Sequence, residues 1–232
     1  MSLRYLAFGF AILIAGCVSV PNQAYNKGAG GTIKKIGVVK VSDPAEYSVM
    51  LVHHPGLGFG LVGGLVAVAD VSSKSKTFTQ QQVDKYVRLG PDLTDALTNA
   101  LSSEGGFEVV VVDGGTQPRS EFLKDYPAAD CDAYLDARIQ TAGYWAQFVS
   151  TPYLPTLFVP VRLVDAHSKT VLYTATVFVT DGEVPKGGEQ IYPETAYSFQ
   201  DFGALKADPD GASEGLRRAT QIAAEQIAKD MK

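Results

Sequence analysis

Residues 58–63 read GFGLVG, which spells the Gly-x-Gly-x-x-Gly turn of dinucleotide-binding proteins. That turn requires a strand before it, a helix that opens at the glycines, and an acidic residue about 20 positions later at the end of the next strand. Here the turn follows HHPGL, and the acidic residue near that distance is Asp84, inside the polar run QQQVDKYV. We therefore expect no dinucleotide cofactor.

Other reactive residue types lack the spacing that chemistry needs. His53 and His54 are adjacent, so on a strand they would point to opposite faces and could not easily share a metal ion. Asp130, Asp132 and Asp136 fall on one face of an expected strand, where carboxylates can act as acid and base, but aspartates at a strand start more often form turns. The sequence contains no Cys-x-x-Cys and no His-x-x-x-His motif. It spells Gly-x-Ser-x-Gly at 211–215 (GASEG), but this match opens the expected carboxyl-terminal helix and does not follow a strand, as a nucleophile elbow requires. We assign no catalytic residue and no metal, and we expect a protein that is not an enzyme.

Four aromatic residues gather in the uncharged stretch TAGYWAQFVSTPYLP: Tyr144, Trp145, Phe148 and Tyr153. Aromatic side chains are enriched in binding interfaces, so these four are candidates for a ligand groove or a peptide site. The alternative is that these aromatic residues only pack a loop against the core, and we favour this alternative.

The amino terminus, MSLRYLAFGFAILIAGC, has the form of a secretory signal. Arg4 supplies a positive charge, and the apolar run over 5–15 is too short to cross a bilayer as a helix, which needs about 20 residues. The run ends in IAGC, which resembles the bacterial lipobox: aliphatic, small, small, Cys. The resemblance implies that residues 1–16 are removed and that a diacylglycerol is attached to Cys17. An ordinary signal peptide with a chance cysteine is the alternative.

The lipid on Cys17 would be the only attached group, and it would anchor the chain to a membrane. Val18 stands where an Asp often marks retention in the inner membrane of enterobacteria, so the predicted location is the periplasmic face of the outer membrane. Residues 17–31 are polar and rich in Gly and Asn, which predicts a flexible tether. Residues 32–232 then form one domain.

Composition is that of a globular protein: 232 residues, 46% apolar, with a net charge of −5. An acidic balance gives no sign of nucleic-acid binding, which needs a basic face. After Cys17 the only cysteine is Cys131, so no internal disulfide is expected and the apolar core must hold the fold.

Periodicity predicts an α/β (α+β) domain, with a mixed sheet and helices packed mainly on one face. Pro91 stands in the first turn of one expected helix, and the other expected helix spans 212–231. A continuous apolar run at 107–113 predicts a strand buried on both faces. Segment 71–82 is expected to be a polar connection between elements, and segment 181–209 is expected to be a long loop. The expected strands span 32–42, 47–54, 107–113, 132–144, 158–164 and 170–179.

A Gly-rich apolar insertion occupies 55–70, and two conformations fit it. On a helix over 57–70, Gly56, Gly60 and Gly64 would form a smooth stripe that another backbone could approach. Such a helix is about 21 Å long, shorter than the roughly 30 Å hydrocarbon core. The alternative is a hairpin that turns at 63–64, of the kind that builds barrels when several subunits contribute, but Pro55 interrupts its first arm. We favour the helix.

The insertion is a candidate membrane or subunit contact. Packing onto the domain's own sheet is the other alternative, since exposed apolar patches are uncommon on monomers. The candidate contact residues are Gly56, Leu57, Phe59, Gly60, Leu61 and Gly64.

Four segments together resemble the periplasmic domains of the TolB amino-terminal type and of curli-secretion-channel lipoproteins. The segments are KKIGVVKV, LTDALTNALSSEGGFEVVVVD, AADCDAYLDARI and VPVRLVDAHSKTVLY, and in the last Lys169 and Tyr173 stand where Gly and Trp are usual. The resemblance covers most of 32–180. It implies an envelope protein that binds or builds something, usually without catalysis, and it brings no catalytic residues.

These observations predict an outer-membrane lipoprotein with a periplasmic binding domain, acting without catalysis in envelope assembly, secretion or transport. Its expected partners are the membrane and either another envelope protein or further copies of itself, with no nucleic acid. One alternative is a periplasmic hydrolase whose site lies in the aromatic loops. The other is a ring or pore subunit that uses the Gly-rich segment.

Overall fold

The computed structural model describes residues 20–26, 28, 33–115 and 119–232, so the predicted signal, Cys17 and much of the tether lie outside the described residues. The strands are β1 (Lys35–Val39), β2 (Ser48–Leu51), β3 (Glu108–Val112), β4 (Ala133–Ala137), β5 (Thr141–Ala146), β6 (Leu154–Asp165), β7 (Val171–Val179) and β8 (Glu189–Ile191). The helices are α1 (Gly60–Asp84), α2 (Leu89–Ser103), α3 (Phe202–Ala207) and α4 (Pro209–Asp230), with short 3₁₀ turns η1 (Pro55–Phe59) and η2 (Thr195–Tyr197).

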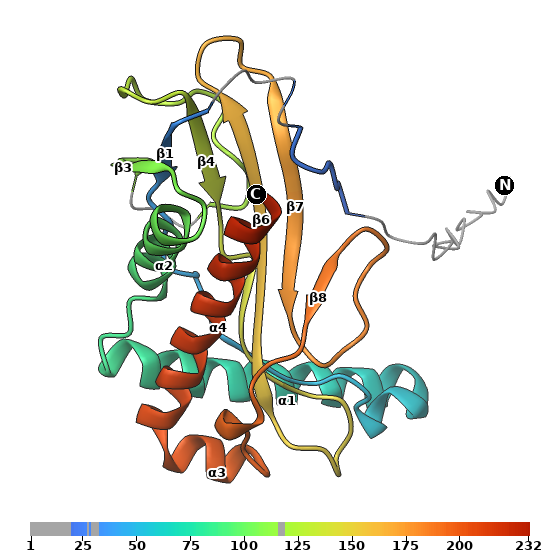
Figure 1. Ribbon diagram of the computed structural model, residues 1–232. Helices are drawn as coiled ribbons and strands as arrows, with labels where there is room; N and C mark the ends of the chain where they lie inside the picture. Colours follow the sequence, from blue (N-terminus) through green and yellow to red (C-terminus); the bar gives the residue numbers. More distant parts are fainter. Residues whose placement is uncertain (1–19, 27, 29–32, 116–118) are drawn as a thin grey trace, which may run out of the picture.

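The eight described strands join one mixed sheet in the order β2-β5-β6-β4-β1-β3, with β7 also pairing with β6, and β8 with β7 (Figure 1). The long hairpin β6–β7 connects the two branches of this sheet. Because β6 has twelve residues, it pairs with β4 and β5 one after the other along the same side: Ala137 lies opposite Val161, and Thr141 opposite Phe158. The sheet therefore forks at 138–140, where the pair β1·β4 separates from the pair β2·β5.

Helices α2 and α4 pack side by side on one face of the sheet, as predicted (Figure 1). On α2 the side chains of Leu93, Leu97 and Leu101 recur at helical spacing and are fully buried, and α4 buries Leu216 and Ile227 in the same way. Each fully buried leucine stabilises the fold by about 1.5–3 kcal/mol. The predicted fold class, a mixed sheet with helices mainly on one face in one compact domain, is confirmed.

Helix α1 runs along an edge of the sheet instead of over a face. The edge strand β2 would leave backbone N–H groups unpaired, and side chains of α1 accept their hydrogen bonds. Ser75 Oγ accepts from the N–H of Val49 at 2.9 Å, and Thr79 Oγ1 accepts from the N–H of Tyr47 at 2.9 Å. Phe78 lies between them in sequence and is fully buried. This part of α1 closes the edge.

Two expectations about segment boundaries are wrong. The passage 71–82 is part of α1, because its Ser and Thr side chains bond to β2 instead of capping a turn. The expected strand over 132–144 is two strands, β4 and β5, because the chain crosses the fork of the sheet at 138–140.

Two further expectations, on exposure and loop content, are also wrong. Segment 107–113 is not buried on both faces, because β3 is the outer strand beside β1, and only Val112 of its five residues is buried. Its apolar run reflects strand propensity more than burial. The segment 181–209 is not a plain loop, since it contains β8, η2 and α3.

Candidate functional site

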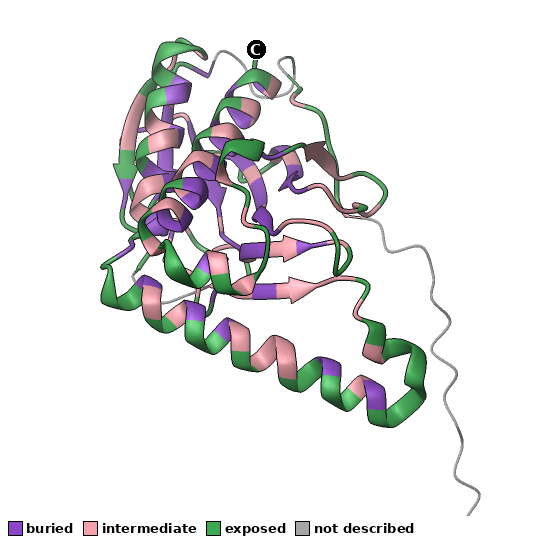
Figure 2. Ribbon diagram, turned by 90° about the horizontal axis from the view of Figure 1, so that it is seen from below, coloured by how far each residue is buried: buried purple, intermediate pink, exposed green. Residues whose placement is uncertain are grey.

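The most unusual surface of the domain lies on η1 and the first turns of α1. We call it the apolar end; its exposed side chains are those of Leu57, Phe59, Leu61, Val62, Leu65, Val66 and Val68. Phe59 is 79% exposed and Leu61 is 85% exposed. No charged residue occurs from 55 to 69. In Figure 2 the start of α1 extends past the strands and is mostly exposed. The chain therefore presents to the solvent a surface that soluble monomers rarely leave open.

Only a narrow stripe of the apolar end is buried. It consists of Gly63 and Ala67, which continue the line of α1 that includes Ser75 and Phe78. The residues on either side of the stripe are apolar as well, so this part of the helix is apolar nearly all round. A helix of that kind is normally surrounded by protein or by lipid.

The glycines of the insertion do not form the predicted stripe that another backbone could approach. The backbone of η1 folds back against α1, and a Cβ on Gly63 would lie 2.0 Å from the carbonyl oxygen of Gly56, so this close approach requires glycine. Gly60 has φ +64° and separates the two helical segments. A Cβ on Gly58, Gly60 or Gly64 would meet no neighbour within 4 Å. The single helix over 57–70 with a stripe of Gly56, Gly60 and Gly64 is therefore wrong in detail, although the segment is helical and forms no hairpin.

His54 fixes the entry to the apolar end. Its Nδ1 accepts a hydrogen bond from the N–H of Gly56 at 3.0 Å, and its Nε2 lies 3.8 Å from a carboxylate oxygen of Asp70. His53 stacks on Phe148 with 4.7 Å between ring centroids. The two histidines have separate neighbours, and no group of three or more His, Cys, Asp or Glu in the described part of the chain is arranged to hold a metal ion.

The Gly-x-Gly-x-x-Gly spelling does not lie in a βαβ unit. The preceding strand, β2, pairs with β5, whereas the next strand in the chain, β3, lies at the opposite edge of the sheet. Asp84, the acidic residue at the motif's distance, ends α1 instead of a strand. The glycines serve the packing of η1 on α1.

A cavity of about 580 Å³ lies between α1 and the strands β2 and β5. Apolar side chains from both sides line it, among them Met50, Leu57, Val68, Val71 and Trp145. It continues the exposed apolar surface inward beneath α1.

The four candidate aromatics do not converge on one site. Tyr144 is fully buried, and its hydroxyl donates to the carbonyl of Ala212 at 3.1 Å. Tyr153 is buried too. Trp145 points from the other face of β5, and its indole N–H donates to Ser48 Oγ at 3.1 Å. Phe148 is 52% exposed and is the one on the surface. Alternation along a strand separates side chains that are adjacent in sequence.

The three aspartates are engaged separately. Asp132 accepts from the N–H groups of Lys34 and Lys35, both at 2.8 Å, and these bonds lower its pKa. Asp130 pairs with Lys35 at 2.9 Å. Asp136 is fully buried and pairs with Arg119 at 2.8 Å. Asp132 and Asp136 accept from backbone N–H groups of other segments, whereas Asp130 pairs with a side chain. Among the described residues none of these three carboxylates forms the expected turn, and the burial of Asp136 was not predicted either.

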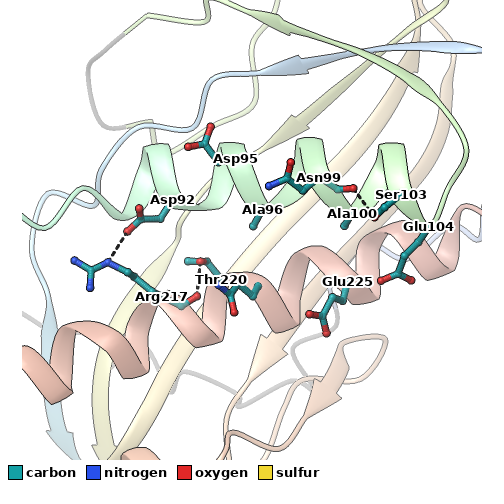
Figure 3. Close-up of a pocket in the computed structure, with 11 residues that line it drawn as sticks. Asp92, Asp95, Ala96, Asn99, Ala100, Ser103, Glu104, Arg217, Thr220 and Glu225 are labelled. Carbon is teal, nitrogen blue, oxygen red and sulfur yellow. Dashed lines mark hydrogen bonds and ion pairs between the residues drawn. The ribbon is translucent and has the colours of Figure 1, made fainter.

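An acidic groove runs between α2 and α4 (Figure 3). Arg217 pairs with Asp92 across it at 3.4 Å, and burial raises the pKa of Asp92. The groove has a volume of about 410 Å³, and its carboxylates lie along its length without converging on one point. The charged residues that line it are Asp92, Asp95, Glu104, Arg217 and Glu225.

The breadth of the exposed surface was not predicted from the sequence. The predicted contact residues lie between Gly56 and Gly64, so the prediction left out Leu65, Val66 and Val68, and it did not include the continuation of α1 to Asp84. The missed signal is the absence of charge from 55 to 69 followed by a polar segment that keeps helical spacing.

No family model matches the chain, and no curated protein matches it. Among solved structures, a PelC dodecamer from Paraburkholderia phytofirmans is 12% identical with a TM-score of 0.39, over 92% of this chain and 96% of that chain. Protein XCC0632 from Xanthomonas campestris, of family DUF330, is 13% identical with a TM-score of 0.37, over 93% of each chain. Neither is described as a TolB-type or curli-secretion domain, so that resemblance stays a prediction. Likenesses this distant carry no function from one chain to the other.

Proposed function

We propose that this protein is a lipid-anchored component of a bacterial envelope, held on the periplasmic face of the outer membrane. Its domain acts by binding in assembly, secretion or transport, without catalysis. Its apolar end inserts into the same membrane. The observation that carries the proposal is the apolar end itself: an exposed helical surface with no charge from 55 to 69.

The width of the exposed apolar surface and its lack of charge favour lipid over a protein contact. Leu61, Val62, Leu65, Val66 and Val68 are all exposed and fall on one continuous arc of about 160° at 3.6 residues per turn, opposite the buried Gly63 and Ala67. A helix that lies in the membrane surface buries one such arc in hydrocarbon, and no charged side chain from 55 to 69 opposes this insertion.

The length of the surface supports shallow insertion. The helical segment Pro55–Asp84 contains an 18-residue stretch that is apolar enough to cross a membrane, and only 11% of that stretch is buried. However, Ser75 and Phe78 bind the second part of α1 to the domain. The free part, 61–69, is about 14 Å long, which is about half of the roughly 30 Å hydrocarbon core. We therefore propose that it enters one leaflet.

The lipobox-like IAGC supports a covalent anchor at Cys17. A single acyl chain binds a membrane only reversibly, and a second membrane-binding element makes attachment stable. The apolar end would add to the lipid in this way, and it would also fix the orientation of the domain against the bilayer.

Two separable experiments test the proposal. Metabolic labelling with a palmitate analogue should label the wild-type protein and not Cys17→Ser; label on the variant would contradict the anchor. Flotation of Cys17→Ser with vesicles then isolates the apolar end. We expect Cys17→Ser to float and Cys17→Ser with Leu61→Asp to remain at the bottom. Equal behaviour of the two would contradict insertion.

The ring or pore alternative makes a different prediction for the same surface. In that case the lipidated protein in mild detergent would have the molar mass of a discrete multiple of the protomer by light scattering, and Leu61→Asp would reduce it to one protomer. The hydrolase alternative requires turnover on a panel of ester, amide and glycoside substrates.

A further inference from the structure

A second cavity, of about 630 Å³, lies at the fork of the sheet and has a polar lining. It lies where β1 leads into 42–46 and where β4 leads into 138–140. The carboxyl ends of β1 and β4 meet there because these two strands are parallel. In open α/β sheets, ligands bind outside the carboxyl ends of strands at such points of divergence. The lining residues are Ser42, Asp43, Pro44, Ala45, Glu46, Arg119, Ser120, Arg138, Ile139 and Gln140.

Arg119 forms part of the cavity wall and is held in place from behind. Its Nη1 donates to Asp136 at 2.8 Å, and its Nη2 donates to the carbonyl of Ala137 at 3.3 Å. Asp136 also accepts from the N–H of Leu123 at 2.8 Å and from the hydroxyl of Tyr126 at 3.2 Å. The carboxylate of Asp136 therefore has three hydrogen-bond donors, and it holds Arg119 in a fixed position.

Arg138 forms the adjacent part of the wall. Its guanidinium lies 5.5 Å from the ring centroid of Phe122, but within the described residues its side chain makes no hydrogen bond and no ion pair. Arg162 packs on the same ring at 4.7 Å. Three guanidinium groups thus lie around a single buried carboxylate, Asp136, and burial lowers the pKa of Arg138.

Three buried polar atoms of the lining residues lack any hydrogen-bond partner in the described structure: Ser42 Oγ, Arg119 Nε and Arg138 Nε. A buried donor without a partner costs about 1–3 kcal/mol, and several at one place indicate a site that is built to receive a further polar group. The cavity also has two carboxylates. Asp43 is already bonded to Arg88 and to the N–H of Gly90, both at 2.8 Å, whereas Glu46 is exposed.

We propose that this cavity binds a small oxyanion, a carboxylate or a phosphate group, between Arg119 and Arg138. A guanidinium fork matches the two oxygens of such a group. Ser42, Ser120 and Gln140 offer neutral hydrogen-bonding groups around it, and the volume suits a small molecule. The site does not rest on the proposed membrane function.

Calorimetric titration of the full mature chain tests the site, with inorganic phosphate and acetate as probes and chloride at matched ionic strength as reference. We expect one saturable site for at least one probe and at least tenfold weaker binding in Arg138→Gln. Saturation by phosphate alone identifies a phosphate ligand, and saturation by acetate alone identifies a carboxylate. No saturation by either probe overturns the proposal.

Two further variants separate site chemistry from general charge. Arg218→Gln removes the same charge from α4, where Arg218 pairs with Glu194 at 2.7 Å, and should leave the affinity unchanged. Glu46→Gln should tighten binding several-fold, because it removes a negative charge from the cavity. Equal weakening in Arg218→Gln and Arg138→Gln would show screening of net charge only and would overturn the proposal. Thermal unfolding of each variant without probe confirms that it is folded.

Discussion

The two parts of α1 differ sharply although they form one continuous helix. The second part contributes Ser75, Phe78 and Gln82 to the buried interior, and its hydroxyl groups complete the hydrogen bonds of β2. The first part buries only Gly63 and Ala67 and exposes apolar side chains around them. The second part serves the stability of the domain, and the first part has a surface that the domain alone does not use.

The comparison shows that the more hydrophobic part of a helix can be its less buried part. The first part of α1 is the more apolar and the less buried, whereas the second part is polar in composition and carries the core contact. Burial follows from the line of residues that meets the sheet, so a polar helix can be firmly packed when its Ser and Thr side chains have backbone partners.

The largest expected effect is the difference between the contributions of the two parts of α1 to the stability of the fold. Phe78→Ala should lower the free energy of unfolding by about 3–5 kcal/mol, because Phe78 is fully buried between the rings of Tyr47 and Tyr144. Phe59→Ala, the same substitution in the segment that leads into the first part, should change it by less than about 0.5 kcal/mol. Urea unfolding measures both; comparable losses would mean that the apolar end is part of the fold.

The next largest expected effect is the difference between the contributions of the two parts of α1 to vesicle binding. Leu61→Asp together with Leu65→Asp should weaken vesicle binding of the Cys17→Ser protein by at least about tenfold, because two exposed leucines would no longer enter the hydrocarbon. The matched control is Thr77→Asp, an exposed position on the second part of the helix, which should leave binding within about twofold. Loss of binding in the control would show that any added negative charge is responsible.

A smaller effect tests how the second part covers the sheet edge. Thr79→Val keeps the shape of the side chain and removes the hydroxyl that accepts from the N–H of Tyr47. Unfolding free energy should fall by about 1–2 kcal/mol, since a backbone donor at the edge would be left without its partner. Thr77→Val, whose hydroxyl donates to the carbonyl of Ser73 within α1, serves as the control. Equal losses would indicate a helix-propensity effect.

The smallest effect shows that stability and membrane binding are separable. Burial and the nearby carboxylate of Asp230 raise the pKa of Glu189 to about 7 in the fold. The fold therefore binds this proton more tightly than the unfolded chain, so stability should rise as the pH falls from about 7 toward the ordinary pKa of Glu. Glu189→Gln should be more stable than the wild type at pH 8, by on the order of 1 kcal/mol or less because the side chain is partly exposed, and about equally stable at pH 5.

Thermal unfolding at the two pH values measures this difference, and vesicle flotation of Glu189→Gln should match the wild type. A variant that is less stable at pH 8 would contradict the sign of the shift.

Sequence patterns correctly predicted the elements that depend on contacts between residues close to one another in the sequence. The helix that begins near Pro91, the carboxyl-terminal helix and the hairpin of β6 and β7 follow from periodicity and turn residues alone, and the structure confirms them. The fork at 138–140 and the edge position of β3 depend on which strands pair, and single-strand patterns carry no such information. Likewise, Arg119 and Arg138 come from a loop and a strand end, and only the fold brings them to one cavity.

The depth of a fluorophore in the bilayer tests the central claim most directly. A polarity-sensitive dye would be placed on Val62→Cys and, as the matched control, on Ser73→Cys, both exposed positions of α1 in a Cys131→Ser background. The lipidated protein would be reconstituted in vesicles that contain nitroxide-labelled acyl chains. We expect strong quenching at position 62 and little at position 73. Equal and weak quenching at the two positions would contradict insertion of the apolar end, and a blue shift at position 62 without quenching would assign that surface to a contact between protein chains.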